Sequence, residues 1–155
     1  MVSNSNSSGG VVADSWTDPD CPVARTLDLV GDRWSLLVVR DAMDGARSFT
    51  DFQQRTGIAR NILTDRLRRL TDRGVLDRRT APSGRRPVYV LTPAGRDLFT
   101  VIVALRQWGE RHAFAAGEAH SVLVDDHGLP LPPLQVMGSD GTHADVGTTS
   151  VRKVR

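Results

Sequence analysis

The chain has 155 residues, of which 39% are hydrophobic and 25% are charged, which is enough for one domain with a core and for additional tails. The formal net charge is only +2, but residues 47–96 hold 12 basic and 4 acidic side chains, whereas residues 1–46 hold 3 and 7. A single cysteine excludes an intrachain disulfide and a thiolate metal cluster, and no apolar run approaches the ~20 residues that a membrane-spanning helix needs. We therefore expect a cytoplasmic protein without a membrane partner.

The first part of the chain predicts a disordered lead followed by two helices. Residues 1–19 are rich in Ser, Asn and Gly and offer few side chains to bury, and they lack the basic start and apolar middle of a signal peptide. Pro22 is typical of a helix start, and the apolar residues that follow it share one helical face up to Gly31. A second helix, at about 32–43, is apolar on several sides and should be the central buried helix.

Two further helices are expected after the turn at residues 44–47. Ser48 and Asp51 have the spacing of an N-terminal capping pair, so a short helix should run from here to Thr56, where Gly57 ends it. The next helix is predicted at about 60–73. Its start has Ala59 where a Ser, Thr or Asp cap is usual, so the first turn is expected either to fray or to take a phosphate as its cap.

The helix at 60–73 has two chemically different faces. Its leucines repeat at the i, i+4, i+7 spacing of a buried face: Leu63, Leu67 and Leu70. The other face carries side chains suited to phosphates and base edges: Arg60, Asn61, Thr64 and Arg68. Arg66 and Arg69 lie nearer the core side, where they are expected to form internal ion pairs or to flank the DNA backbone.

A hairpin with a basic tip is predicted next. Residues 82–87 join two short β-prone runs, and Arg85 and Arg86 lie at the tip, where they can contact phosphate or the minor groove. A polar-faced helix followed by a basic hairpin is the arrangement of a DNA-binding winged helix-turn-helix. Two interpretations compete with it: a solvated helix face beside a charged turn, and a winged-helix module that binds an acidic protein.

The last third of the chain predicts a helix that serves two surfaces. Thr92-Pro93 is a strong start signal, and one apolar stripe runs along the helix to Trp108. A second stripe is expected to pack on a partner chain: Phe99, Val103 and Phe114. Residues 117–155 then predict a small β-ribbon appendage, with strands near 122–124 and 134–136, and a flexible tail.

Six stretches in this order resemble the HxlR family of bacterial transcriptional regulators, which are winged-helix relatives of the MarR family. They are Cys21 to Val23, Leu27 to Trp34, Arg47 to Phe52, Ile58 to Leu70 with its leucine repeat, Gly74 to Leu76, and Tyr89 to Gly95. The resemblance covers about 21–112. It implies a homodimeric regulator that binds double-stranded DNA, with a recognition helix at about 60–73 and a wing at 80–87.

The predicted DNA-binding set follows from these elements: Ser48, Ala59, Arg60, Asn61, Thr64, Asp65, Arg68, Arg85 and Arg86. Cys21 has two interpretations. It is either a small buried hydrophobe or a redox sensor, as in several members of the resembled family, with Arg25 one turn on to favour the thiolate. No nucleophile elbow, Gly-rich phosphate loop or metal-ligand spacing is present, so we expect no enzyme activity, no cofactor and no metal.

The predicted fold is mainly α with small β: a winged helix-turn-helix with a C-terminal dimerisation helix and a β appendage. The predicted domains are the lead at 1–19, the winged helix-turn-helix at 20–116 and the appendage with its tail at 117–155. The predicted function is a homodimeric repressor whose operator binding responds to a small molecule or a thiol-reactive electrophile.

Overall fold

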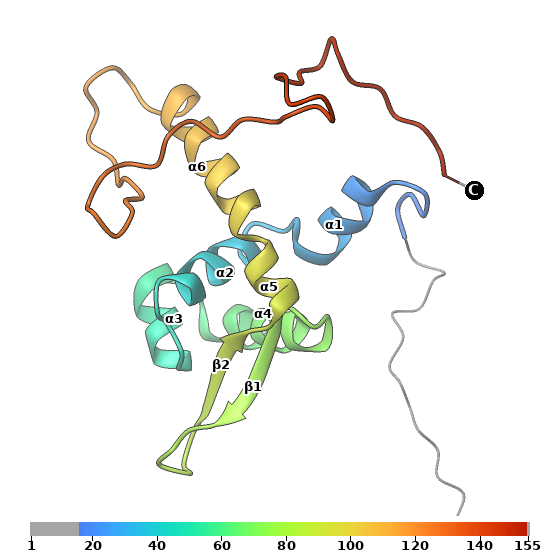
Figure 1. Cartoon of the computed structure of the whole chain (residues 1–155). Coiled ribbons are helices and arrows are strands. Elements are labelled where there is room, and N and C mark those ends of the chain that lie inside the picture. Colours follow the sequence, from blue (N-terminus) through green and yellow to red (C-terminus); the bar gives the residue numbers. More distant parts are fainter. Residues whose placement is uncertain (1–15, 155) are drawn as a thin grey trace, which may run out of the picture. The chain divides into compact units, whose positions relative to one another are not determined.

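The computed structural model describes residues 16–154, and it is mainly helical with one two-stranded sheet (Figure 1). The elements in chain order are α1 (Pro22–Val30), α2 (Ser35–Met43), α3 (Phe49–Thr56), α4 (Arg60–Asp72), β1 (Leu76–Thr80), β2 (Pro87–Leu91), α5 (Pro93–Asp97) and α6 (Phe99–His112). This is the predicted fold class. Most of the expected N-terminal lead, residues 1–15, lies outside the described residues.

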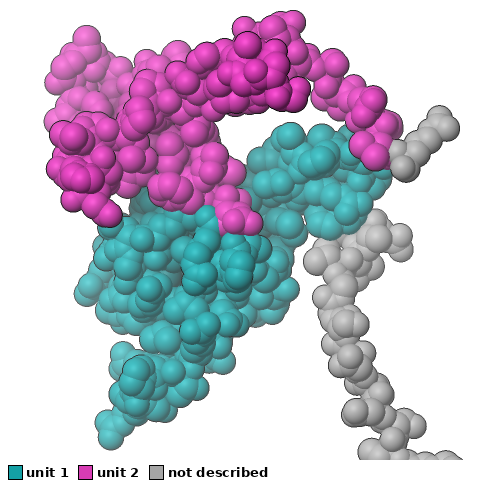
Figure 2. Space-filling view, viewed as in Figure 1, with its two compact units in different colours: residues 1–96 teal, residues 97–155 magenta. Residues whose placement is uncertain are grey.

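Two compact units divide the chain after Arg96 (Figure 2). The first unit holds α1 to β2 and most of α5, and the second holds α6 with the C-terminal segment. The predicted winged-helix domain extended to residue 116, so this grouping assigns α6 to the other side of the division. The predicted domain boundaries concern independent folding and stay a prediction.

The core of the first unit lies around α2, which packs against α3, α4 and β2. Val38 and Val39 of α2 are fully buried, as expected for a central helix. The side chains that complete this core come from the neighbouring elements: Phe52, Leu63, Leu67, Leu70 and Leu76. Each fully buried residue of this size stabilises the fold by about 1.5–3 kcal/mol relative to leaving it exposed.

The helix-turn-helix consists of α3 and α4, and its ends are fixed by local bonds. Ser48 and Asp51 form the predicted capping box: the Ser48 hydroxyl accepts from the Asp51 amide at 3.1 Å, and the Asp51 carboxylate accepts from the Ser48 amide at 2.9 Å. Backbone hydrogen bonds from Ser48 and Arg47 hold the pKa of Asp51 below its usual value. Gly57 ends α3 with a φ of 67°, a left-handed conformation that favours glycine.

The wing is an antiparallel hairpin in which Leu76 of β1 pairs with Leu91 of β2 and Thr80 with Pro87. The Gly84 amide donates to the Ala81 carbonyl at 2.7 Å, which closes the turn at the tip. On β2, the Tyr89 amide donates to the Arg47 carbonyl at 2.8 Å. The base of the wing is therefore bonded to the residue just before the capping box of α3.

The chain after the wing does not form the single helix predicted from Pro93. α5 ends at Asp97 and α6 begins at Phe99, with Leu98 as its N-cap. The Thr92 hydroxyl donates to the Gly74 carbonyl at 2.5 Å and accepts from the Gly95 amide at 3.0 Å, so the start of α5 is fastened to the start of β1. This bond anchors α5 separately from the helix that follows it.

The C-terminal segment contains single β-bridges in place of the predicted strands at 122–124 and 134–136. The bridges join Val124 with Pro130 and Met137 with His143. At the first bridge, prolines at 130, 132 and 133 lack the amide hydrogen that a strand ladder needs, which limits the pairing there. Instead, the Gln107 side chain of α6 binds the segment, donating to the Pro132 carbonyl at 2.9 Å and accepting from the Leu134 amide at 2.6 Å.

We predict that Gly95→Ala destabilises the fold by about 1–3 kcal/mol, the usual cost of overpacking. A Cβ at Gly95 would collide with the Val75 backbone carbonyl, which cannot move without disturbing the bonds of Thr92. Gly109→Ala is the matched control, because a Cβ there meets no atom within 4 Å and alanine favours the helix. Urea unfolding should show a lower midpoint for the first variant and an equal or higher one for the second; equal midpoints for both would contradict this packing.

Candidate nucleic-acid interface

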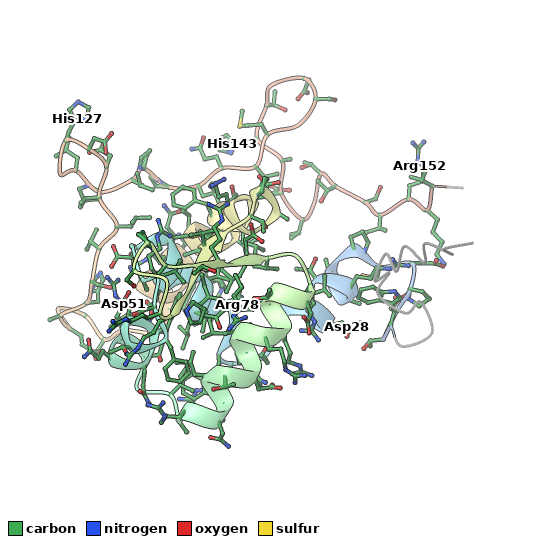
Figure 3. All side chains as sticks on the ribbon, turned by 90° about the horizontal axis from the view of Figure 1, so that it is seen from below. Asp28, Asp51, Arg78, His127, His143 and Arg152 are labelled. Carbon is green, nitrogen blue, oxygen red and sulfur yellow. The ribbon has the colours of Figure 1, made fainter. Side chains whose placement is uncertain are left out.

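The exposed face of α4 carries the polar side chains predicted for DNA contact. Leu63, Leu67 and Leu70 bury one side of the helix, and this burial turns the opposite side outward. The exposed residues there are Arg60, Asn61, Thr64 and Arg68 (the helix is pale green in Figure 3). The Arg60 guanidinium lies 5.0 Å from the centre of the Phe49 ring, a cation–π contact that steadies it beside the first turn of α4.

The N-terminus of α4 has the open geometry expected of a phosphate site. Ala59 is its N-cap and gives no side-chain hydrogen bond to the first turn. The first amide hydrogens of a helix have no acceptor within the helix, and together with the helix dipole they favour an anion. Ala59 and Arg60 are both exposed, so a DNA backbone can reach this end of the helix.

One predicted site residue, Asp65, is surrounded by arginines of its own helix. Its carboxylate accepts from Arg68 at 2.8 Å and from Arg66 at 2.5 Å, and Arg69 lies 3.8 Å away. The hydrogen bond from Arg68 is the largest cause of a pKa below the usual value for Asp65. The carboxylate is therefore ionised at neutral pH.

The internal ion pair expected for Arg66 joins α4 to the start of α2. Arg66 Nε donates to Asp32 Oδ2 at 2.7 Å. Burial pushes the pKa of Asp32 upward, but hydrogen bonds from Ser35, Arg66 and the Trp34 amide together hold it below its usual value. Asp32 thus caps α2 and binds Arg66 with the same carboxylate, which orients α4 about its axis.

The wing presents four arginines around one hollow. Arg78 and Arg79 of β1 line it with Arg85 and Arg86 of the tip. All four side chains are exposed, and Arg79 lies 3.5 Å from Asp77 (Arg78 is labelled in Figure 3). The sequence prediction included the tip pair but not Arg78 and Arg79. Their place in a charge-rich run just before the turn was the signal that could have included them.

The predicted site residues do not all have free side chains. Ser48 is half-buried and its hydroxyl caps α3, and Asp65 is held by arginines. The remaining members of the predicted set are exposed, on α4 or on the wing: Ala59, Arg60, Asn61, Thr64, Arg68, Arg85 and Arg86. Contact of any of them with DNA stays a prediction.

Cys21 is the N-cap of α1 and is partly buried. Its sulfur accepts from the Ala24 amide at 3.5 Å. Arg25, which was expected to favour the thiolate, instead donates to the Pro19 carbonyl at 2.8 Å and lies 4.8 Å from the centre of the Trp16 ring. Neither of these Arg25 contacts is with the Cys21 sulfur.

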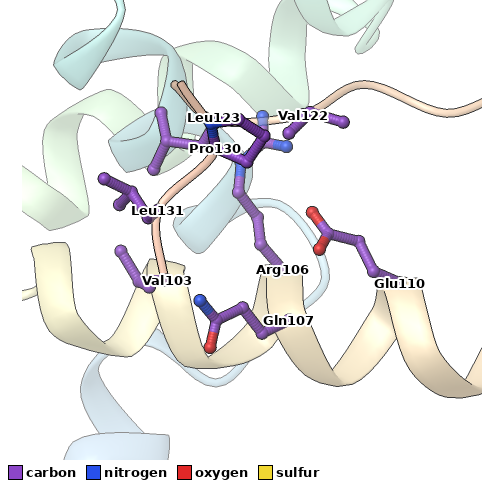
Figure 4. Close-up of a pocket in the computed structure, with 8 residues that line it drawn as sticks. All are labelled: Val103, Arg106, Gln107, Glu110, Val122, Leu123, Pro130 and Leu131. Carbon is purple, nitrogen blue, oxygen red and sulfur yellow. The ribbon is translucent and has the colours of Figure 1, made fainter. Parts of the chain in front are cut away.

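The predicted dimer stripe on α6 is not equally exposed along its length. Val103 is only 6% exposed and lines a small pocket with residues of the C-terminal segment, among them Leu123 and Leu131 (Figure 4). Phe99 and Phe114 remain exposed. A different apolar face of α6 is open to solvent, with the i, i+4, i+7 spacing of Val101, Leu105 and Trp108.

Residues 16–154 contain neither a cluster of metal ligands nor a membrane-spanning helix. No group of three or more His, Cys, Asp or Glu side chains in this range could hold a metal ion. No helix in the same range is both long and apolar enough to cross a membrane.

Comparison with known proteins identifies the family. The model of HxlR-like helix-turn-helix proteins matches residues 29–116, which is more than half of the chain. The HTH-type transcriptional regulator MT3179 of Mycobacterium tuberculosis is 47% identical over 91 residues, and the match covers 58% of this chain and 58% of that relative, so part of the relative's length has no counterpart here. The solved structure of PA1607, a candidate transcription factor, has a TM-score of 0.82 at 49% identity, over 85% of this chain and 94% of PA1607.

A redox regulator is also similar in structure. HypR in its oxidised form matches with a TM-score of 0.53 at 32% identity, over 59% of this chain and 97% of HypR. The region matched by the family model contains the helix-turn-helix and the wing described above. The chain belongs to the HxlR-like helix-turn-helix family of transcriptional regulators.

Proposed function

We propose that this protein is a homodimeric transcriptional repressor that binds double-stranded DNA, with α4 contacting the bases and the wing contacting the phosphate backbone. The observation that carries the proposal is the joint placement of an exposed polar face of α4 and an arginine-lined wing on one unit. Residues 47–96, which contain both, hold 12 basic and 4 acidic side chains. A local excess of positive charge draws DNA in and releases counterions when phosphates are neutralised.

The residues divide by the chemistry that they offer. Asn61 can bond an adenine edge with both atoms of its amide, and Arg60 or Arg68 can do the same with guanine. Arg85 and Arg86 at the wing tip are exposed and form no ion pair within residues 16–154, which suits phosphates or a narrow minor groove. The uncapped first turn of α4 suits a phosphate as well.

The homodimer is supported by the open face of α6. Val101, Leu105 and Trp108 are 37%, 52% and 59% exposed, and an apolar stripe of this kind is stabilised when a second copy covers it. A dimer places two recognition helices on half-sites about 34 Å apart. We propose this face in place of the one containing Val103, which is covered within its own chain.

The signal that we propose is a thiol-reactive or other small molecule. Cys21 lies at a helix N-terminus, and the similar protein HypR is named a redox regulator. An adduct on Cys21 would change the start of α1 without touching a DNA-facing residue. The cysteine is the only one in the chain, so any disulfide must form between subunits or with a small thiol.

We expect Arg85→Ala to weaken binding to specific and random duplex DNA alike, because a bond to phosphate carries no base identity. The slope of log affinity against log salt should become shallower by about 1 for each phosphate that the variant no longer neutralises. Fluorescence anisotropy between about 50 and 200 mM salt measures both quantities. Arg111→Ala removes an exposed arginine from α6 and is the matched control.

A second variant separates base reading from phosphate binding. Asn61→Ala should lose roughly 1–3 kcal/mol of discrimination at one base position and little affinity for random DNA. Absence of salt-dependent binding to any duplex by the wild type would instead favour a winged-helix module that binds an acidic protein.

We expect Leu105→Glu to convert a dimer into a folded monomer, because it would bury a charge without a partner in the proposed interface. Analytical ultracentrifugation measures the change, and operator affinity should fall with it since the two half-sites are no longer linked. Thr100→Glu adds the same charge at an exposed position of α6 outside the stripe. A dimer that persists in Leu105→Glu would remove this face from the interface.

If Cys21 is the sensor, oxidants should change the operator affinity of the wild type and leave the operator affinity of Cys21→Ser unchanged. The rate of alkylation of the native thiol against pH gives its pKa independently of DNA. A thiol pKa at or above about 8.5, the value of a free thiol, together with slow labelling, would show that Cys21 is a packing residue. The switch would then be a pocket that binds a small molecule.

A further inference from the structure

A carboxylate stands in the middle of the DNA-facing side of α4. The buried leucines of the helix lie at positions 63, 67 and 70, and at 100° per residue position 65 falls nearly opposite them. Asp65 therefore lies among Asn61, Arg68 and Arg69. A negative charge at the centre of a surface that binds DNA opposes phosphates and the many acceptor atoms of base edges.

The surrounding bonds keep Asp65 in place. Arg66 donates to Asp65 on one side and to Asp32 at 2.7 Å on the other. Asp32 is itself fixed, because it accepts from the Trp34 amide at 3.1 Å and from the Ser35 amide at 3.2 Å. The position of the Asp65 carboxylate is therefore set from the start of α2 through a half-buried ion pair.

The same carboxylate engages Arg68, which belongs to the predicted DNA-binding set, and its exposed neighbour Arg69. Arg68 donates to Asp65 Oδ1 at 2.8 Å, and Arg69 Nη1 lies 3.8 Å from Asp65 Oδ2. Both arginines are exposed and are one helical turn from Asp65, where side chains of a helix meet. A phosphate must compete with Asp65 for Arg68, and the wing arginines have no equivalent competitor in the described residues apart from Asp77 beside Arg79.

We propose that Asp65 is a specificity-determining residue that withholds Arg68 and Arg69 from the backbone of non-operator DNA. On a random sequence only phosphates are available to the two arginines. To bind a phosphate they must give up their ion pairs with Asp65, and the negative charge of Asp65 repels the phosphate, so that the gain in binding free energy is smaller. On an operator, a base donor such as the cytosine amino group can bond Asp65 while Arg68 reaches its own acceptor. Asp65 therefore penalises wrong sequences more than the right one, which is how discrimination is raised without new attraction.

The proposal rests on the proposed DNA-binding function, and its test uses two duplexes. One is selected by the wild-type protein from a random pool, and the other is a scrambled duplex of the same composition. Asp65→Asn should bind the scrambled duplex roughly fivefold more tightly, the upper end of what an exposed ion pair is worth. The salt slope on that duplex should steepen by about 1 per freed arginine, and the gain on the selected duplex should be smaller.

Two controls separate this role from a general effect of charge or folding. Asp97→Asn makes the same change in charge at an exposed position of α5, outside α4 and the wing. In an Arg68→Ala background, Asp65→Asn should lose most of its effect on the salt slope, because the two residues act as a pair. Asp65→Ala, with its thermal unfolding measured alongside, replaces Asp65→Asn if that variant does not fold.

Three outcomes would overturn the proposal. Equal gains on both duplexes would make Asp65 a general electrostatic penalty without a part in discrimination. The same gain from Asp97→Asn would show that only net charge matters. An unchanged affinity for both duplexes would show that Arg68 and Arg69 do not meet phosphate. Failure of the wild type to select or bind any duplex is a separate result, because it removes the proposed function itself.

Discussion

The burial of one face of α4 is the constraint on which the candidate interface depends. Leu63, Leu67 and Leu70 fill the core beside α2, and a helix that buries three residues in this spacing has no freedom to rotate. The ion pair between Arg66 and Asp32 further stabilises this orientation of α4. The orientation of the helix decides which side chains are exposed, because a shift of one residue would move each of them by about 100° around the axis.

The parts of the fold that could be predicted from the sequence are those with a local physical signature. The capping box at Ser48 and the end of α3 at Gly57 depend on bonds between near neighbours, and the leucine repeat depends only on helical spacing. The break at Leu98 and the missing strands in the C-terminal segment depend on tertiary anchors instead. Gln107, for example, binds backbone atoms more than twenty residues away.

In the candidate interface, too, some features follow from local sequence patterns and others depend on tertiary contacts. The exposed residues on α4 follow from its periodicity, whereas the ion pairs of Asp65 depend on where Arg66, Arg68 and Arg69 place their guanidinium groups. The covering of Val103 depends on the course of the C-terminal segment along α6, which has no periodic signal. Periodicity identifies an exposed face, but it does not show which of the long charged side chains on that face form ion pairs with one another.

The bond between the Tyr89 amide and the Arg47 carbonyl has a mechanical consequence. It joins the base of the wing to the backbone that immediately precedes the capping box of α3, so the hairpin cannot swing away from the helix-turn-helix without breaking it. The bond also occupies part of the outer edge of β2, which reduces the chance that another chain adds a strand there. In the proposed DNA complex, α4 and the wing therefore meet a duplex at a separation that is set within the unit before any DNA is present.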